Sequence, residues 1–235
     1  MWPFVVRALD VATILLLAAI GELLNERAGV LNVGIEGLML LGAAFGFLTA
    51  IIWGLIPGYI IGIAVGALFG LLHAVLSITL RVNQVVSGMG IWLFAMGLVT
   101  YGVDRYSGPL PAWITSIRIY GLSPIFFISI IVVFIIWFIL TKTHLGLKIR
   151  SAGENPFAAE VSGVKVIRIR YLCTVTGGAL SGLAGAFLSL TYLGVWSHLP
   201  TKGLGWIAFA LVMFSLWRPL ILLGGSLLFG FIWQF

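Results

Sequence analysis

The sequence contains little charge. Only 9% of its 235 residues are Asp, Glu, Lys or Arg, whereas a soluble domain usually carries about 25%. Hydrophobic residues make up 61% of the chain. A water-soluble fold of this size could not bury so much apolar surface. The composition therefore excludes a soluble globular protein and predicts an integral, multi-pass membrane protein.

Signatures of enzymatic chemistry are missing as well. The single cysteine, Cys173, excludes an intrachain disulfide and supports no metal cluster. The sequence has no GxxxxGKS/T loop for ATP, no HExxH zinc motif and no GxSxG nucleophile elbow. Its seven acidic residues are too few and too scattered for a two-carboxylate hydrolase. We therefore expect a chain that is not an enzyme and that holds no cofactor or metal.

Long apolar runs take the place of the missing charge. They reach the roughly 20 residues that a helix needs to cross a hydrocarbon core about 30 Å thick. They are continuous rather than alternating, which favours helices over a barrel. We predict an all-α, polytopic transmembrane bundle that forms a single domain over residues 1–235. About eight membrane helices are expected, at 4–24, 35–53, 59–80, 84–101, 124–140, 171–192, 206–217 and 220–235.

The last of these runs has no polar tail, so we expect the chain to be truncated at its C-terminal end. Near the other end, Arg7 and Asp10 are three residues apart in the first predicted helix and can meet on one face. They form either an ion pair at the end of a helix or part of a polar pathway, because ionisable groups inside a membrane are often functional.

Basic residues are concentrated in one segment, 141–170, which we call the basic loop. It holds six of the thirteen Lys and Arg residues. Cytoplasmic loops carry such an excess, so the basic loop is predicted to face the cytoplasm. This sidedness accounts for much of the net charge of +6, and no nucleic-acid partner is expected.

Inside the basic loop, Asn155 can cap a helix whose first residue is Pro156. The spacing predicts a short helix over Phe157–Val161 that ends near Gly163. The apolar side chains at its two ends lie four residues apart, on one face. Such a helix is either a docking element for a partner or a solvated connection.

The most polar stretch between two apolar runs is Gly21–Gly37, GELLNERAGVLNVGIEG, which we call the polar island. It contains three of the seven acidic residues and four glycines. Irregular backbone at membrane depth survives only where protein buries it or where it lines a wet cavity. The polar island is therefore either part of a transport path or a cytoplasmic turn rich in caps.

A second polar patch, Arg81–Gly90, opens the fourth predicted helix. Its Asn83 and Ser87 could contact a polar solute or join helices to each other. Two series of small residues at four-residue spacing predict close helix packing. They comprise Gly62, Gly66 and Gly70 in the third predicted helix, and Gly178 and Gly182 in the sixth.

Two of these stretches resemble one family. ERAGVLNVGIEGLML at Glu26–Leu40 and GLKIRSAGENPFAAEVSGVKVIRIRYL at Gly146–Leu172 are similar to the N-terminal signature and the cytoplasmic coupling loop of permease subunits of ATP-binding-cassette (ABC) importers. The similarity is to the simple-sugar and nucleoside branch, within the branched-chain amino acid and ribose type of permease. Gly178–Leu190 and Gly203–Pro219 fit this branch too.

The resemblance implies a subunit in the cell membrane that forms half of a translocation path for nucleosides or simple sugars. Its implied partners are a second permease, two cytoplasmic ATP-binding subunits, an extracytoplasmic solute-binding lipoprotein and the lipid bilayer. ATP would be bound by the partner subunits. Members of this branch usually continue through further helices.

By the same resemblance, the residues expected to contact an ATP-binding subunit are Gly153, Asn155, Pro156, Phe157, Ala158, Ala159, Val161 and Gly163. The residues expected along the translocation path are Glu26, Arg27, Asn32 and Glu36 of the N-terminal signature, together with Asn83 and Ser87, which the polarity of the second patch suggests independently of the resemblance. The alternative function is a self-contained secondary transporter or channel, which would need an ion site built from Arg7, Asp10 or Glu36.

Overall fold

The computed structural model describes residues 2–106, 108–111, 114 and 118–234. The described elements, in chain order, are α1 (Trp2–Arg27), α2 (Ile35–Trp53), α3 (Leu55–Ala74), the π-helix η1 (Val75–Thr79), α4 (Gln84–Gly102), the 3₁₀-helix η2 (Asp104–Tyr106), β1 (Gly108–Pro109), α5 (Pro124–Lys142), α6 (His144–Glu154), α7 (Pro156–Val161), α8 (Val166–Phe187), the π-helix η3 (Leu188–Leu193), β2 (Val195–Trp196), α9 (Leu204–Phe214) and α10 (Pro219–Trp233).

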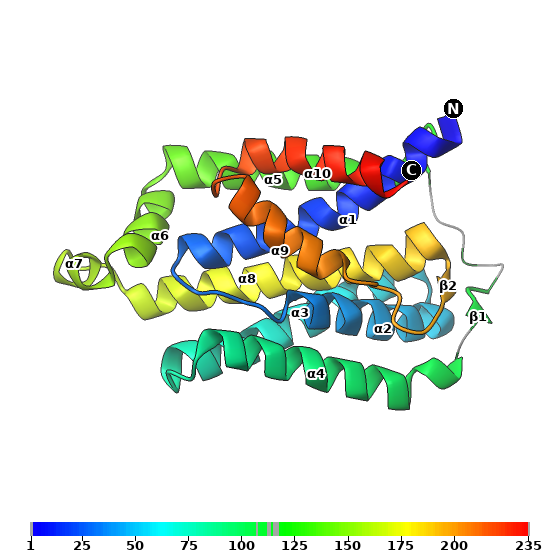
Figure 1. The fold of residues 1–235 in the computed structure, drawn as a ribbon, viewed down its shortest axis with the longest axis horizontal. Helices are drawn as coiled ribbons and strands as arrows, with labels where there is room; N and C mark the ends of the chain where they lie inside the picture. Colours follow the sequence, from blue (N-terminus) through cyan, green and yellow to red (C-terminus); the bar gives the residue numbers. More distant parts are fainter. Residues whose placement is uncertain (1, 107, 112–113, 115–117, 235) are drawn as a thin grey trace.

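The bundle has a buried centre and an apolar periphery. Most of α1, α2 and α8 is buried, whereas α3, α4 and α5 turn most of their surface outward. Large apolar side chains such as Phe94, Phe134 and Phe138 are exposed on this periphery. In a membrane protein such faces meet lipid or another membrane subunit. Figure 1 shows α1, α8 and α2 between α5 and α10 on one side and α4 on the other.

Six segments of the described chain are long and apolar enough to cross a membrane. They are Trp2–Arg27, Ile35–Trp53, Leu55–Thr79, Gln84–Gly102, Pro124–Lys142 and Val166–Leu193. The predicted all-helical membrane bundle is thus confirmed in outline, but the predicted number of about eight membrane helices is not. The two remaining apolar helices, α9 and α10, have only 11 and 15 residues.

The helix expected over 206–217 ends early for a local reason. Its backbone turns after Phe214, and Leu216 and Trp217 adopt left-handed conformations with φ of 52° and 53°. Pro219 then begins α10 at a first-turn position. At a rise of about 1.5 Å per residue, 11 residues span only about 16 Å, roughly half of a hydrocarbon core.

The helices α3 and α8 pack backbone to backbone along their glycines. A Cβ atom added at Gly178 would lie 2.5 Å from the carbonyl oxygen of Gly66 and 2.8 Å from the Cα atom of Gly70. One added at Gly182 would lie 2.8 Å from the Cα atom of Gly66, and one at Gly62 would meet Ala186. Only residues without a side chain permit this approach, and both helices continue beyond it into π-helical turns, η1 and η3.

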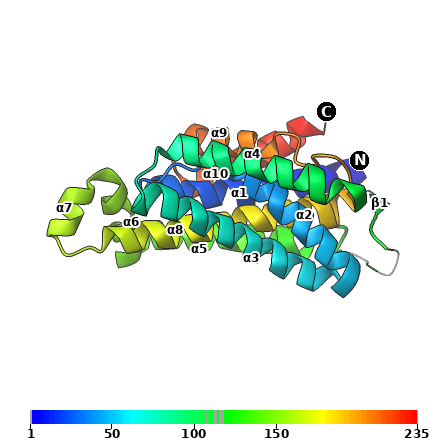
Figure 2. The same cartoon turned by 90° about the horizontal axis from the view of Figure 1, so that it is seen from below.

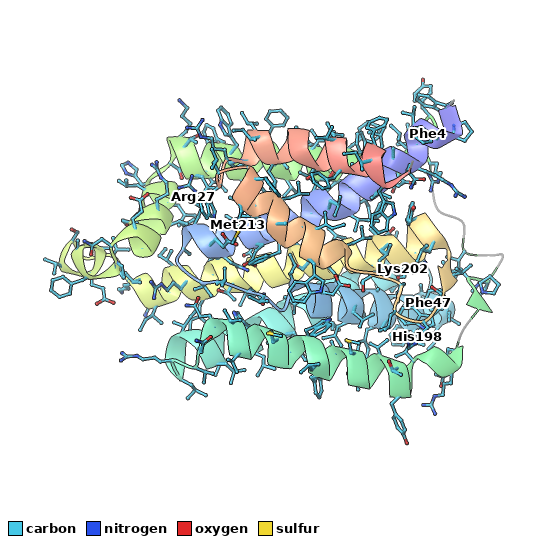
Figure 3. The ribbon with its side chains drawn as sticks, in the orientation of Figure 1. Phe4, Arg27, Phe47, His198, Lys202 and Met213 are labelled. Carbon is cyan, nitrogen blue, oxygen red and sulfur yellow. The ribbon has the colours of Figure 1, made fainter. Side chains whose placement is uncertain are left out.

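The connections between helices gather at two ends of the bundle. Figures 1 and 2 place α6 and α7 beyond one end, and the N-terminus, β1 and β2 at the other. β1 and β2 form one short antiparallel pair, Gly108 with Trp196 and Pro109 with Val195, which the sequence had not predicted. Figure 3 shows Arg27 near the α6 end and Lys202 and His198 toward the opposite end.

The predicted partner of Asp10 is wrong. The buried Asp10 carboxylate forms its salt bridge with Arg118, at 3.1 Å, and not with Arg7. Arg118 also donates to the carbonyl oxygens of Gly121 and Thr191. The guanidinium thereby ties the connection between β1 and α5 to α1 and to η3. This pair is therefore a structural contact between distant segments and not an ion pair within one helix.

Candidate functional site

The polar island is helical at both ends and irregular only over 28–34. α1 continues through Glu22 and Glu26, and it ends where Gly29 adopts a left-handed conformation with φ of 81°. The amides of Ala28, Gly29 and Val30 donate to carbonyl oxygens of the last turn of α1. The chain then turns back from the α6 end, and α2 begins part-way along the bundle (Figure 1). The irregular segment therefore runs beside the long apolar helices and is packed within the protein.

Glu22 holds this segment in place. Its carboxylate is buried and accepts hydrogen bonds from the backbone N–H of Asn32, at 2.7 Å, and from Nδ2 of Asn25, at 2.8 Å. The Oδ1 atom of Asn32 in turn accepts from the N–H of Gly34 at 3.0 Å. Buried backbone donors need acceptors, and Asn32, one of the predicted path residues, is used here to satisfy the loop itself.

Side chains from α3 and α4 form hydrogen bonds with the backbone in the middle of the irregular segment. Nε2 of His73 bonds to the carbonyl oxygen of Leu31 at 3.0 Å, and its Nδ1 bonds to Oγ of Ser87 at 3.1 Å. The N–H of Leu31 donates to Oε1 of Gln84 at 2.8 Å. Ser87 is thus buried and partnered, whereas Asn83 is exposed and caps the N-terminus of α4.

Glu36 joins the start of α2 to the start of α9. Its carboxylate accepts from the N–H of Gly203 at 2.9 Å and from the N–H of Gly205 at 2.6 Å. The side chain is only 5% exposed. A carboxylate at a helix N-terminus meets both the free N–H groups and the positive end of the helix dipole. The short helix α9 is therefore anchored inside the bundle by a residue from the polar island.

Glu26 and Arg27 reach the turn that follows α9. Nε and Nη2 of Arg27 donate to the carbonyl oxygen of Trp217, at 3.1 and 2.9 Å, and the carboxylate of Glu26 accepts from the indole N–H of Trp217. The structure thus brings four predicted path residues, Glu26, Arg27, Asn32 and Glu36, into one connected region. In it they bond to protein groups, and their contact with solute stays a prediction.

The basic loop contacts the polar island directly. Nε of Arg170 donates to the carbonyl oxygen of Ala28 and Nη2 donates to that of Ala152, each at 3.1 Å. A Cβ atom at Gly153 would lie 3.1 Å from the amide nitrogen of Gly29. Gly153, predicted to contact an ATP-binding subunit, therefore packs against the polar island. A displacement of α6 would be transmitted to the end of α1.

We expect Arg170→Lys to weaken this connection. An ammonium group cannot reproduce the two-pronged contact of the guanidinium with two carbonyl oxygens, and the loss should cost about 1–2 kcal/mol. The measurement is the temperature at which half of the detergent-solubilised protein aggregates. Arg168→Lys is the matched control, because Arg168 is exposed on the same helix. If the two variants aggregate at the same temperature, the contacts of Arg170 do not stabilise the connection between the basic loop and the polar island.

Two helices, and not one, occupy the basic loop. α6 precedes the predicted short helix and was not expected from the sequence. Thr143 caps it by accepting from the N–H of Gly146. The predicted short helix is present as α7, with Oδ1 of Asn155 accepting from the N–H of Ala158 at 3.0 Å. Gly163 follows it with φ of 83°.

The two faces of α7 differ. Phe157 is 77% exposed and Val161 is 76% exposed, on the outer face. Ala159 is buried in a small cluster with Ala152 and Val166. Its side chain therefore supports α7 from inside and does not face outward. Of the residues predicted to contact an ATP-binding subunit, Phe157 and Val161 offer apolar contact area on the exposed face.

Four residues of this region were not among the predicted site residues, namely Glu22, His73, Gln84 and Arg170. Each makes bonds to backbone groups of the polar island or of α6. For Glu22, the sequence contained one indication of a hydrogen bond, because Asn25 follows it by three residues in the same helix. Among the described residues, no group of three or more His, Cys, Asp or Glu side chains could hold a metal ion.

Comparison with known proteins connects this arrangement to transport. The family described as "Branched-chain amino acid transport system / permease component" matches residues 4–235. A protein of Haloferax volcanii, provisionally named a glucose ABC transporter permease protein, is 40% identical over 93% of this chain and 72% of its own length. The guanosine ABC transporter permease protein of Bacillus subtilis is 37% identical over 92% of this chain and 76% of its own length.

The nucleoside ABC transporter permease protein of Lactococcus lactis is 33% identical over 93% of this chain and 77% of its own length. No solved structure matches. The family match covers the polar island, the basic loop and the turn after α9, which the structure joins. This chain is an integral membrane protein and belongs to the family of permease components of branched-chain amino acid transport systems, with homologues among ABC permeases.

Proposed function

We propose that this chain forms half of the translocation path of an ABC importer for nucleosides or simple sugars. A second permease would complete the path, and two cytoplasmic ATP-binding subunits would bind and hydrolyse ATP. An extracytoplasmic lipoprotein would deliver the solute. The relatives named for glucose, guanosine and nucleosides support the substrate class, and another nucleoside ABC transporter permease protein of Lactococcus lactis is 34% identical over 44% of this chain.

The main support for the proposal is the position of α7 and its exposed apolar face. Figure 1 places this helix beyond the end of the bundle, and about three quarters of the surface of Phe157 and Val161 is exposed on its outer face. Exposed apolar side chains on a capped helix outside the membrane favour a protein partner. Behind α7, the basic loop is bonded through Arg170 to the polar island. A partner that moves α7 would therefore act on the centre of the bundle.

The hydrogen bonds of the buried carboxylates Glu22 and Glu36 argue against a self-contained, ion-driven transporter. Glu22 and Glu36 are the acidic side chains placed deepest in the polar island, and each already accepts from backbone N–H groups. Asp10 is paired with Arg118 through Oδ2, whereas its Oδ1 atom and the Oε1 atom of Glu26 are buried without a hydrogen-bond partner. An ion-coupled site needs acidic oxygens that can receive the ion. The backbone contacts of Glu22 and Glu36 therefore favour a structural role for these two carboxylates, in a path whose movement is driven from outside the chain.

Replacement of Phe157 and Val161 by Asp tests the docking role of α7. The double variant should lose at least about tenfold in copurification of the ATP-binding subunit, because two desolvated apolar contacts are each worth more than about 1 kcal/mol at an interface. Uptake should fall in parallel, while membrane insertion stays unchanged. The matched control is Ile167→Asp, which adds a charge at an exposed apolar position outside α7. Undiminished copurification of the double variant would refute the docking role.

The solute itself can be assigned through the binding protein. A thermal-shift screen of the cognate lipoprotein against nucleosides and simple sugars should show stabilisation by one class, because a ligand that binds only the folded state raises its melting temperature. Uptake of that class should then require ATP. Uptake by this chain alone, driven by an ion gradient in liposomes, would refute the proposed importer.

A further inference from the structure

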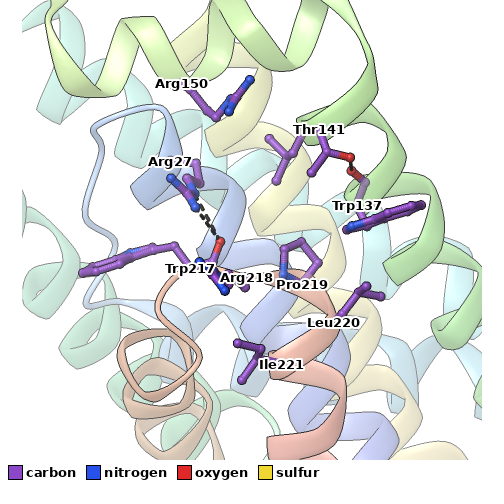
Figure 4. A pocket seen from close by; sticks show the side chains of 10 residues that line it. Arg27, Trp137, Thr141, Arg150, Trp217, Arg218, Pro219, Leu220 and Ile221 are labelled. Carbon is purple, nitrogen blue, oxygen red and sulfur yellow. Dashed lines mark hydrogen bonds between the residues drawn. The ribbon is translucent and has the colours of Figure 1, made fainter.

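A cavity lies at the α6 end of the bundle, between the ends of α1 and α5, α6 and the turn that precedes α10. Its volume is about 420 Å³. Figure 4 shows Arg27, Arg150 and Arg218 around this space, together with Trp137 and Trp217. Three guanidinium groups from three separate segments thus converge on one cavity.

The three arginines have no carboxylate in direct contact. In the part of the chain that the structure describes, the salt bridge is the one between Asp10 and Arg118, toward the other end. Glu154 is near enough to attract Arg27 but is not paired with it, and the carboxylate of Glu26 is bonded to the indole of Trp217. Arg150 and Arg218 each repel Arg27 electrostatically. An anion in the cavity would offset this repulsion.

The arginine side chains that line the cavity are not all fully hydrogen-bonded. The Nε atom of Arg150 is buried without a hydrogen-bond partner, and buried polar groups are normally partnered. Arg27 uses Nε and Nη2 on the carbonyl oxygen of Trp217, which fixes the orientation of its guanidinium. Planar guanidinium groups match the geometry of phosphate oxygens and bind them with two parallel hydrogen bonds.

Apart from Thr141, the rest of the wall is apolar. Leu140 and Trp137 come from α5, and Pro219, Leu220 and Ile221 come from the start of α10. Leu220 and Ile221 are 42% and 44% exposed. A ligand with a charged head at the arginines would therefore have room for apolar chains along α5 and α10. Basic pockets between membrane helices on the cytoplasmic side bind anionic lipid headgroups.

We propose that this cavity binds the phosphate headgroup of an anionic phospholipid, with its acyl chains against α5 and α10. The bound phosphate bridges Arg27 of the polar island, Arg150 of the basic loop and Arg218 after α9. A lipid in this position therefore stabilises the contact between the three segments. The site is separate from the exposed face of α7, and it includes Arg27, one of the predicted path residues.

The test is native mass spectrometry of the full chain, purified in detergent and supplied with phosphatidylglycerol or with phosphatidylcholine of the same acyl chains. The protein should retain phosphatidylglycerol preferentially. Each arginine charge that is removed should reduce its retention roughly fivefold. Arg150→Gln alone should therefore show one such reduction, and Arg150→Gln together with Arg218→Gln should show two. Arg168→Gln, an exposed charge outside the cavity, should leave retention unchanged. The single variant also serves if the double variant does not fold.

A competition with millimolar inorganic phosphate separates a lipid from a soluble anion. Preferential retention of phosphatidylglycerol in the presence of phosphate supports the lipid site. Displacement of the lipid, with phosphate itself retained by lipid-free protein, would overturn the lipid assignment in favour of a soluble anion. Equal retention of phosphatidylglycerol by the wild type and the Arg150→Gln variant would overturn the site altogether.

Discussion

Replacement of Glu36 by Ala is expected to destabilise the bundle by at least about 3 kcal/mol. The substitution removes the acceptor for the N–H groups of Gly203 and Gly205, which lie 2.9 and 2.6 Å from its carboxylate oxygens. Each hydrogen bond to a charged group contributes about 1.5–3 kcal/mol, and a buried donor left without a partner costs a similar amount. The positive end of the α9 dipole would lose its compensating charge as well.

The measurement is the midpoint of thermal aggregation in detergent, which should fall by roughly 6–12 °C for a loss of 3 kcal/mol in a chain of this size. Glu36→Gln should recover part of the loss, because one oxygen still accepts while the amide group meets a second donor. Glu160→Ala is the matched control, since Glu160 is an exposed carboxylate and its removal should shift the midpoint little. A Glu36→Ala midpoint equal to that of the control would show that α9 is anchored by other contacts.

Gly178→Ala is expected to have the second largest effect. The new Cβ atom would lie 2.5 Å from the carbonyl oxygen of Gly66 and 2.8 Å from the Cα atom of Gly70. Both neighbours are backbone atoms of α3, so neither can turn aside as a flexible side chain would. The two helices must separate, and overpacking of this kind costs about 1–3 kcal/mol. Uptake should fall too, because η1 and η3 continue directly from these two helices.

Gly97→Ala is a control in which the same substitution is not expected to lower the stability. Nothing lies within 4 Å of a Cβ atom at Gly97, which is also helical. Alanine is favoured over glycine in a helix by about 0.8–1.0 kcal/mol, so this variant should be as stable as the wild type or slightly more so. Thermal aggregation measured for both variants in parallel checks the difference, and a Gly178→Ala variant that behaves like Gly97→Ala would rule out the close approach of α3 and α8.

Local patterns predicted several features well. The apolar runs located six helices that can span a membrane, and glycine spacing identified the surfaces on which α3 and α8 meet. The cap at Asn155 and the proline after it predicted α7 to within a residue. These features depend on side chains a few residues apart, and such short-range effects are the ones that sequence periodicity and capping express.

The partners of the buried polar side chains were not predictable in this way. Glu36 and its two donors are separated by more than 160 residues, and the same holds for Arg27 and Trp217. Arg7 was the nearest opposite charge to Asp10 in the sequence, yet Arg118 reaches it across the bundle. A buried polar group bonds to whichever partner packing brings within reach, and sequence spacing carries no information on that choice.

A helical membrane permease could be inferred without the structure, because the composition excludes a soluble fold and one permease family matches residues 4–235, including both polar segments. The tertiary structure decided how those segments are joined. It places the end of α1 against the basic loop through Arg170, and the beginning of α2 against α9 through Glu36. The physical reason is that a buried charge requires a partner, and only the folded chain selects which distant group provides it.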